Sequence, residues 1–275
     1  MKKKIIISGV IIIGLLSALV VIYKNQKIDI DITVPDYYSL AYYNYDGDFN
    51  EFYNDSYSWY KSIENKYGVY IINTSYYNGE LLKIWKDENI YKAVPDKAFW
   101  YFAASPSYLR QMNIDINEND LNDAKAGVRL YLVPDTLNDD EYAVMSAYLD
   151  EEAKYKAEKG AIKTAFTENK EVKIIRYTPN GSYFTWQSDK GQPVTDDAPV
   201  IYVCTSENMK YFESESLIAT GINSYIKFIN KETMEKYTNA NILKKYNMNF
   251  LPSSEIYKNA SKVKLVDSGI EKAFE

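Results

Sequence analysis

The stretch Ile5–Tyr23, IIISGVIIIGLLSALVVIY, decides how the rest of the chain is arranged. It contains no charged residue and directly follows three lysines, Lys2–Lys4. As an α-helix it would extend over about 28 Å at ~1.5 Å per residue, close to the ~30 Å hydrocarbon thickness of a bilayer. The pattern therefore predicts a transmembrane helix over residues 5–23, which would contact membrane lipid.

A cleaved secretory signal peptide is the alternative interpretation of this stretch. Signal peptides usually have an apolar region of about 7–15 residues and end in small residues. Here the bulky residues Leu19–Tyr23 occupy the expected cleavage region, so an uncleaved anchor is favoured. More lysines precede the stretch than follow it at Lys24 and Lys27, which predicts a cytoplasmic segment at residues 1–4 and an extracytoplasmic location for the rest.

The composition indicates a folded, acidic extracytoplasmic part. Hydrophobic residues make up 46% of the chain, and the rest after the anchor is long enough for one large domain or two small ones. We expect a domain over residues 37–275, alternatively divided into lobes near 37–125 and 126–275. The net charge of −6 becomes −9 without Lys2–Lys4, which argues against nucleic acid as a partner.

The absence of histidine and the single cysteine, Cys204, exclude several kinds of site. Triads with histidine, zinc sites built on His or Cys, and an internal disulfide are all ruled out. Cys204 lies in an apolar run and is interpreted as a small core residue. The sequence Asp46–Asn50 resembles a calcium loop only faintly, because Glu51 and Tyr57 stand where glycine and glutamate are required. We expect no metal and no cofactor.

The serine–lysine spacing S-x-x-K occurs three times. The matches are at Ser58/Lys61, Ser224/Lys227 and Ser261/Lys264, and neither S-D-N nor K-T-G accompanies them. Three scattered matches in a chain rich in both residues are interpreted as chance. The acidic pairs Asp139/Asp140 and Asp196/Asp197 are interpreted as helix starts or solvated loops. A glycosidase-type carboxylate pair stays open, since its members converge only in the fold, but we expect a protein that is not an enzyme.

Hydrophobic periodicity predicts an α+β fold of small mixed sheets with packed helices. A membrane-proximal strand over Lys27–Val34 within the linker 24–36 precedes it. Capping boxes at Asp48/Glu51 and Asn138/Glu141 predict helices ending near Gly68 and Lys159. Further strands are expected at Val69–Asn73, Leu81–Trp85, Lys97–Ala103, Val128–Val133, Glu171–Thr178, Ser182–Gln187, Pro199–Thr205 and Ser224–Ile229, and further helices from Pro106 and over Glu207–Ala219, Lys231–Tyr246 and Ser254–Phe274. Pro179-Asn180-Gly181 predicts a hairpin between the fifth and sixth of these strands.

The segment 37–77 is unusually rich in aromatic residues, in a chain with 28 tyrosines. Tyrosine and tryptophan present flat amphipathic faces to ligands, so Tyr42, Tyr43 and Trp59 are candidate contacts for a carbohydrate or peptide. The alternative is that these side chains are half-buried packing, or lie at the membrane interface.

Three short phrases resemble the extracytoplasmic part of FtsX/MacB-like permeases, most closely the bacteriocin-associated integral membrane proteins of Gram-positive bacteria. They are Ala103–Leu109, Tyr131–Pro134 and Ala198–Thr205. The resemblance implies a domain that works with permease and ATPase subunits and responds to peptides or antibiotics, and it implies no catalytic residues. After Lys258 no further apolar run of membrane length follows, which departs from the permease pattern. The expected function is a non-catalytic, membrane-anchored extracytoplasmic domain of, or accessory to, an ABC-type peptide or bacteriocin export or immunity permease. The alternative is a cell-surface carbohydrate- or peptide-binding module that uses the tyrosine-rich segment 37–77.

Overall fold

The computed structural model describes residues 35–155, 160–186, 195–238 and 240–258. The predicted transmembrane segment 5–23, the strand Lys27–Val34 and residues 259–274 of the predicted last helix lie outside these ranges. No helix in the described ranges combines the length and apolar character needed to cross a membrane. Residues 253–258 are helical, in agreement with the start of the predicted last helix.

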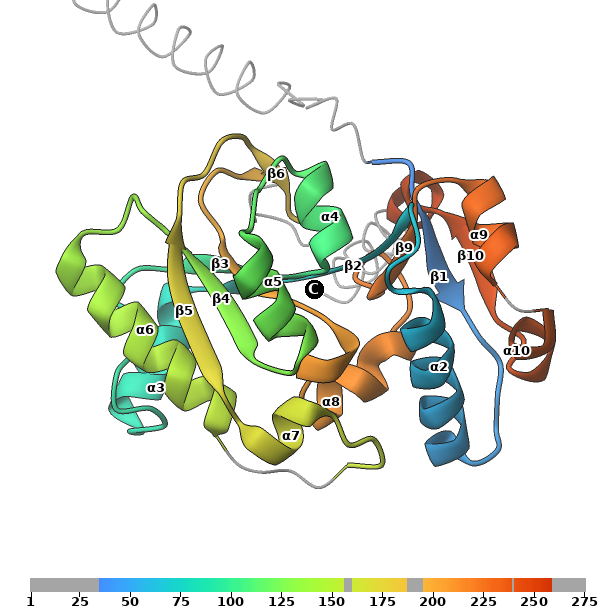
Figure 1. Cartoon of the computed structure of the whole chain (residues 1–275), viewed down its shortest axis with the longest axis horizontal. Coiled ribbons are helices and arrows are strands. Elements are labelled where there is room, and N and C mark those ends of the chain that lie inside the picture. The colour runs from blue at the N-terminus through green and yellow to red at the C-terminus, as the bar shows by residue number, and fades with distance from the viewer. Residues whose placement is uncertain (1–34, 156–159, 187–194, 239, 259–275) are drawn as a thin grey trace, which may run out of the picture. The chain divides into compact units, whose positions relative to one another are not determined.

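One mixed eight-stranded sheet organises the fold (Figure 1). Its order is β10 (Asn249–Pro252), β1 (Tyr38–Tyr42), β9 (Ile226–Phe228), β2 (Val69–Tyr77), β3 (Phe99–Ala104), β8 (Val200–Val203), β4 (Arg129–Pro134) and β5 (Val172–Tyr177). The pairs β3·β8 and β4·β5 are parallel, and the other neighbours are antiparallel. A separate two-stranded ribbon joins β6 (Tyr183–Phe184) to β7 (Thr195–Asp196). The α+β class is confirmed, with one large sheet in place of the expected small ones.

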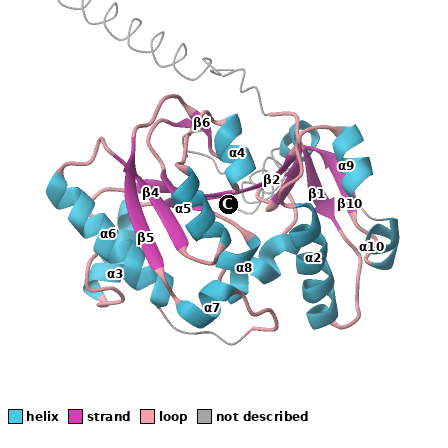
Figure 2. Ribbon diagram, viewed as in Figure 1, coloured by secondary structure: helices cyan, strands magenta, loops and turns pink. Residues whose placement is uncertain are grey.

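Helices cover both faces of the sheet (Figure 2). They are α2 (Phe49–Ile63), α3 (Gly79–Asp87), α4 (Pro106–Gln111), α5 (Glu118–Lys125), α6 (Asp139–Lys154), α7 (Ala165–Asn169), α8 (Tyr211–Glu215), α9 (Lys231–Tyr237) and α10 (Ala240–Lys245). Side chains of α2, α6 and α10 pack in one core cluster, and those of α4 and α5 pack in the other. The sheet is therefore buried on both sides.

Strand alternation divides the core between these two clusters. In β4, Tyr131 and Val133 point to the face covered by α2 and α6, while Leu130 and Leu132 point to the opposite face. Both sets are at most 1% exposed, so Leu130–Val133 are apolar at consecutive positions instead of at every second one. This explains why the continuous apolar runs in the sequence mark strands at the centre of the sheet.

The strand predicted at Pro199–Thr205 is confirmed as central, because β8 lies between β3 and β4. The predicted strands Lys97–Ala103 and Val128–Val133 correspond to β3 and β4, and Pro106 begins α4 with Ser105 as its N-cap. Strands from residues 37–125 and from 126–275 share this one sheet: β9 lies between β1 and β2, β10 pairs with β1, and β8 pairs with β3.

The strand predicted at Leu81–Trp85 is wrong, because these residues form α3. Asn78-Gly79 suggested a hairpin turn, but the Asn78 side chain accepts a hydrogen bond from the backbone N–H of Leu81 at 2.9 Å. That bond is the N-cap of a helix, a role in which asparagine is as favourable as in a turn.

The hairpin predicted at Pro179-Asn180-Gly181 is also wrong. Strand β5 pairs in parallel with β4, and β6 pairs with β7, so the two expected hairpin strands have other partners. The Asn180 side chain is engaged by the Tyr183 hydroxyl at 2.8 Å and by the carbonyl of Asn113. The chain bends at Gly181, but long-range pairing decides which strands meet.

Helix ends differ from the predictions in several places. Asp48 is the N-cap of α2, and its side chain accepts a hydrogen bond from the backbone N–H of Asn50. The Glu51 side chain bonds to Lys245. The helix ends at Ile63 instead of near Gly68. The capping box Asn138/Glu141 is confirmed, although α6 ends at Lys154. The helices predicted over 207–219 and 231–246 are broken, the first into α8 with flanking 3-10 turns and the second into α9 and α10.

Candidate functional site

A groove of about 370 Å³ lies at one end of the sheet, and we call it the acidic groove. The start of β3, the end of β4, the start of β8 and the first turns of α6 form it. Its apolar lining includes Phe99, Trp100, Leu137, Val144 and Val200. Four carboxylates also line it, from Asp96, Asp140, Glu141 and Asp196. The site thus combines an apolar floor with an acidic rim.

Two of the four carboxylates are neutralised within the domain. Asp96 bonds to Lys86, and Glu141 accepts a hydrogen bond from Lys97 at 2.6 Å. In the described ranges no lysine or arginine lies within ion-pair distance of Asp140 or Asp196. The groove therefore keeps two negative charges available to a ligand.

Burial raises the pKa of Asp196, and the neighbouring charge of Asp197 adds to the effect. The Asp196 carboxylate accepts one hydrogen bond, from the backbone N–H of Ala198 at 3.2 Å, which favours the charged form and opposes the shift. A cation bound beside Asp196 would relieve the cost of this partly desolvated charge.

Trp100 in the groove lining carries a buried polar atom without a partner in the described structure. Its side chain is 2% exposed, and its indole N–H is buried without a hydrogen-bond partner among the described residues. An unsatisfied buried donor costs about 1–3 kcal/mol, so such groups are uncommon in folded proteins. At the other extreme, Val144 on α6 is 38% exposed although it is apolar.

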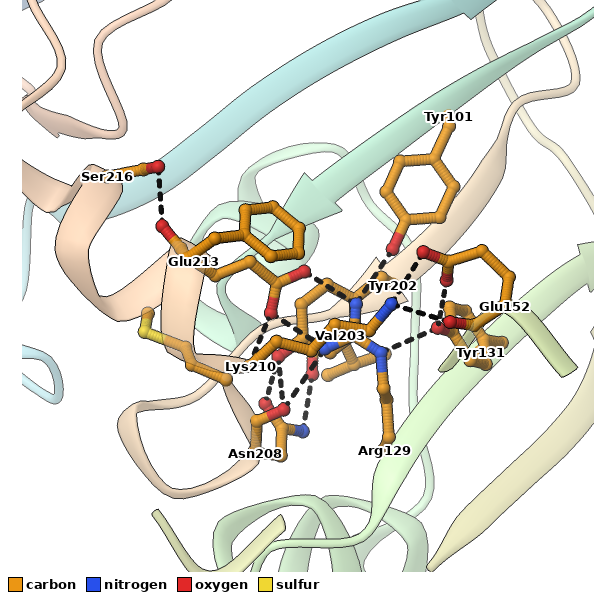
Figure 3. Close-up of polar contacts among 12 residues, drawn as sticks. Tyr101, Arg129, Tyr131, Glu152, Tyr202, Val203, Asn208, Lys210, Glu213 and Ser216 are labelled. Atoms are coloured by element: carbon orange, nitrogen blue, oxygen red, sulfur yellow. Dashed lines mark hydrogen bonds and ion pairs between the residues drawn. The ribbon is translucent and has the colours of Figure 1, made fainter. Parts of the chain in front are cut away.

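A buried ion pair occupies the face of the sheet under α6 and α8 (Figure 3). The Arg129 guanidinium donates two hydrogen bonds to the Glu213 carboxylate, at 2.6 and 2.8 Å, and both side chains are at most 5% exposed. Arg129 also donates to the Tyr131 hydroxyl at 2.6 Å and lies 3.7 Å from the ring centroid of Tyr202. This bidentate, stacked geometry suits arginine and not lysine.

Electrostatics hold this pair in its charged form. Burial alone would raise the pKa of Glu213, but the charge and hydrogen bonds of Arg129 outweigh it and keep that pKa below its ordinary value. Burial raises the pKa of Tyr131, so its hydroxyl stays protonated. Every charged hydrogen-bonding group of the pair has an internal partner, and the pair is therefore structural instead of a catalytic acid or base.

Ser224 and Lys227, one of the three S-x-x-K matches, do come together. The Lys227 ammonium lies 3.4 Å from the Ser224 hydroxyl oxygen, and it donates to the carbonyls of Ile222, at 3.0 Å, and of Ser224. The face of Trp186 covers it, with 4.6 Å from the nitrogen to the ring centroid. Both Ser224 and Lys227 are 0% exposed, so this contact offers a substrate no access.

The remaining S-x-x-K matches form no such contact in the described structure. Lys61 bonds to Glu207, and Ser261/Lys264 lie outside the described ranges. The same ranges contain no cluster of acidic or cysteine side chains that could hold a metal ion. Cys204 is buried, and burial raises its pKa, as expected for a core thiol.

The three predicted contact residues have different surroundings. Tyr42, at the end of β1, is 52% exposed, whereas Tyr43 packs edge-on against Phe52 with ring centroids 5.0 Å apart. Trp59 on α2 is 8% exposed, and its indole N–H donates to the carbonyl of Tyr237 at 2.8 Å. A part of Trp59 lines a wider polar groove between α2 and α10. The three side chains thus range from solvent to core.

Comparison with known proteins gives no match: no family model, curated protein or solved structure is significantly similar to this chain. Function must therefore be inferred from the site itself. Sequence reasoning missed the acidic groove, although it noted two of its signals, the acidic pairs Asp139/Asp140 and Asp196/Asp197. Helix capping explains the first pair locally, and only the fold places Asp140 and Asp196 around one apolar groove.

Proposed function

We propose that the chain is a tethered, non-catalytic binding domain that takes a peptide segment in the acidic groove. The observation that supports this proposal is an apolar groove of about 370 Å³ with two carboxylates, Asp140 and Asp196, that have no basic partner in the described structure. An apolar side chain would fill the floor, and an adjacent lysine, arginine or free amine would meet the rim.

Two features of the sequence support the proposed membrane tether and the proposed partners. Residues 5–23 would hold the domain at the outer side of a membrane, and the permease-like phrases favour work beside an ABC-type export or immunity system. The buried ion pair has a structural role in this proposal, because Arg129 and Glu213 bond to each other inside the domain. The carbohydrate-binding alternative has less support, since Trp59 offers little exposed face.

Peptide titration of the full-length protein in detergent tests the groove. The probe is an acetylated, amidated peptide of alternating leucine and lysine, compared with the same peptide carrying glutamine in place of lysine. We expect the lysine peptide to bind more tightly. The double variant Asp140→Asn/Asp196→Asn should weaken it about 3- to 10-fold, because each partly exposed ion pair contributes roughly 0.2–1 kcal/mol.

Glu235→Gln is the matched control, because Glu235 is an exposed acid on α9 outside the groove lining. Equal binding of the two peptides, or equal losses in control and groove variants, would refute the peptide assignment. Cell fractionation tests the tether: deletion of residues 1–24 should move the protein out of the membrane fraction. Co-purification with permease and ATPase subunits tests the proposed partners.

A further inference from the structure

A second pocket, of about 270 Å³, lies beside the last turn of α6, at the end of this helix away from the acidic groove. Its charged lining is Lys154, Lys170, Lys210 and Glu152, and we call it the lysine pocket. Three cations against one carboxylate are notable in a chain whose net charge is −6. We propose that the lysine pocket binds a carboxylate carried on an aromatic or apolar group, such as the C-terminal residue of a peptide.

Lys210 sets the pocket apart from an ordinary solvated lysine cluster. Its side chain is 13% exposed, and its ammonium donates to the carbonyl oxygen of Glu152 at 2.9 Å and to the Glu152 carboxylate at 2.5 Å. The backbone N–H of Lys210 donates to Glu213, so the residue is anchored to the buried ion pair beneath (Figure 3). The cation is thus held in one place at the pocket wall.

The electrostatics of Lys210 favour an additional anion. Burial lowers its pKa, and the positive charge of Arg129 lowers it further, while Glu152 and Glu213 oppose the shift. A ligand carboxylate would restore part of the lost solvation and add an opposite charge. Charge-assisted hydrogen bonds of this kind are stronger than neutral ones.

The other two lysines are differently engaged. Lys154 bonds to Asp150 at 2.5 Å, with both side chains more than 40% exposed, so this ion pair is weak and easily exchanged. No carboxylate of the described residues lies within ion-pair distance of Lys170, which is the C-cap of α7 in the left-handed conformation at φ 51°. Lys170 is therefore the cation most available to a ligand.

Aromatic side chains complete the lysine pocket. Phe212 is 46% exposed and Tyr155 is 37% exposed, while Phe166 is buried at 2%. Exposed aromatic rings in the lining of a basic pocket would gain burial from an apolar ligand body. A small inorganic anion would leave these rings in water, so the lining selects a larger carboxylate.

The test compares N-acetyl-phenylalanine with its amide, by isothermal titration of the full-length protein in detergent. We expect the acid to bind at least about tenfold more tightly than the amide, and its affinity to fall with added salt. Lys170→Met should weaken binding of the acid about fivefold or more and leave the amide unchanged. Phe212→Ala should weaken both probes. Lys231→Met is the control, because Lys231 is an exposed lysine of α9 outside the pocket.

Each result has a defined meaning. Equal affinities for acid and amide, no saturation by about 10 mM acid, or equal losses for Lys170→Met and Lys231→Met would each overturn the proposal. Unchanged thermal unfolding of Lys170→Met would show that a loss of binding is not a loss of fold. The acetylated cationic peptide amides used for the acidic groove carry no carboxylate, so failure at one site leaves the other site testable.

Discussion

Replacement of Lys227 by methionine should stabilise the protein near neutral pH and flatten the pH dependence of its stability. Lys227 is 0% exposed, and its ammonium contacts carbonyl groups, a hydroxyl and the ring of Trp186, without a carboxylate among the described residues. Burial lowers its pKa from 10.5 to about 7. An uncompensated buried lysine is costly, and the cost depends on pH.

The sign of this pH dependence follows from the protons that Lys227 binds in the folded and unfolded states. Between pH 7 and 10.5 the unfolded chain carries a proton on Lys227 that the folded protein lacks. Stability therefore rises with pH across this window, by up to about 1.4 kcal/mol per pH unit from this group, and the penalty is constant below pH 7. Over two pH units inside the window the Lys227 contribution changes by about 2–3 kcal/mol.

Methionine would remove the cost of burying the lysine amine. It would also leave the carbonyls of Ile222 and Ser224 without the hydrogen-bond donor of Lys227, at a cost of about 1–3 kcal/mol. We therefore expect Lys227→Met to gain about 2–4 kcal/mol at pH 7, from a full penalty near 5 kcal/mol. This gain in the free energy of unfolding should become smaller as the pH rises. Nearby tyrosines do not interfere, since burial raises the pKa of Tyr37 to about 12 and that of Tyr108 above its ordinary value.

Equilibrium urea unfolding, followed by tryptophan fluorescence at several pH values within the window, measures the effect. Lys231→Met is the control, because its side chain is 66% exposed. Other groups contribute to the slope in both variants, so the difference from the wild type isolates Lys227. A stability difference that stays constant with pH, or that grows as the pH rises, would refute the reasoning.

Two further changes test the packing, and both are checked by chemical or thermal unfolding. Arg129→Met should lower the free energy of unfolding by about 3–5 kcal/mol, because it leaves the Glu213 carboxylate buried and unpaired. The double variant Arg129→Met/Glu213→Leu should recover much of that loss. A double variant no more stable than the single one would contradict this expectation. Gly127→Ala should cost about 1–3 kcal/mol, since Gly127 has φ +105° and an added Cβ would lie 2.4 Å from the Cβ of Ala165. Gly79→Ala, at a position with no atom within 4 Å, should be nearly neutral, and similar losses at both glycines would count against this explanation.

The elements that the sequence predicts correctly are those with a local cause. Pro199–Thr205 is a largely apolar run and Val128–Val133 is apolar except at Arg129, and both become central strands because both faces of the sheet are covered. The Asn138/Glu141 capping box depends on residues three positions apart, so its bonds form wherever the helix is placed.

The failures have a long-range cause. Nothing local distinguishes Arg129 from a solvated strand residue, because its Glu213 partner lies 84 positions away in sequence. The partners of β5 and β6 are likewise chosen by the sheet and not by the turn between them. The two candidate pockets are assembled from separate segments, so their opposite charges emerge only in three dimensions.

The place of β1 in the sheet has a consequence for biosynthesis. Its two neighbours, β9 and β10, are supplied by residues 226–252, almost two hundred positions later. A ribosome therefore delivers β1 long before β9 or β10 can pair with it, and this edge of the sheet closes only after residue 252 has emerged. Contacts this distant in sequence slow folding and leave strand edges open to wrong partners meanwhile. Nascent chains arrested before residue 226 should therefore depend on chaperones, and the finished protein should not.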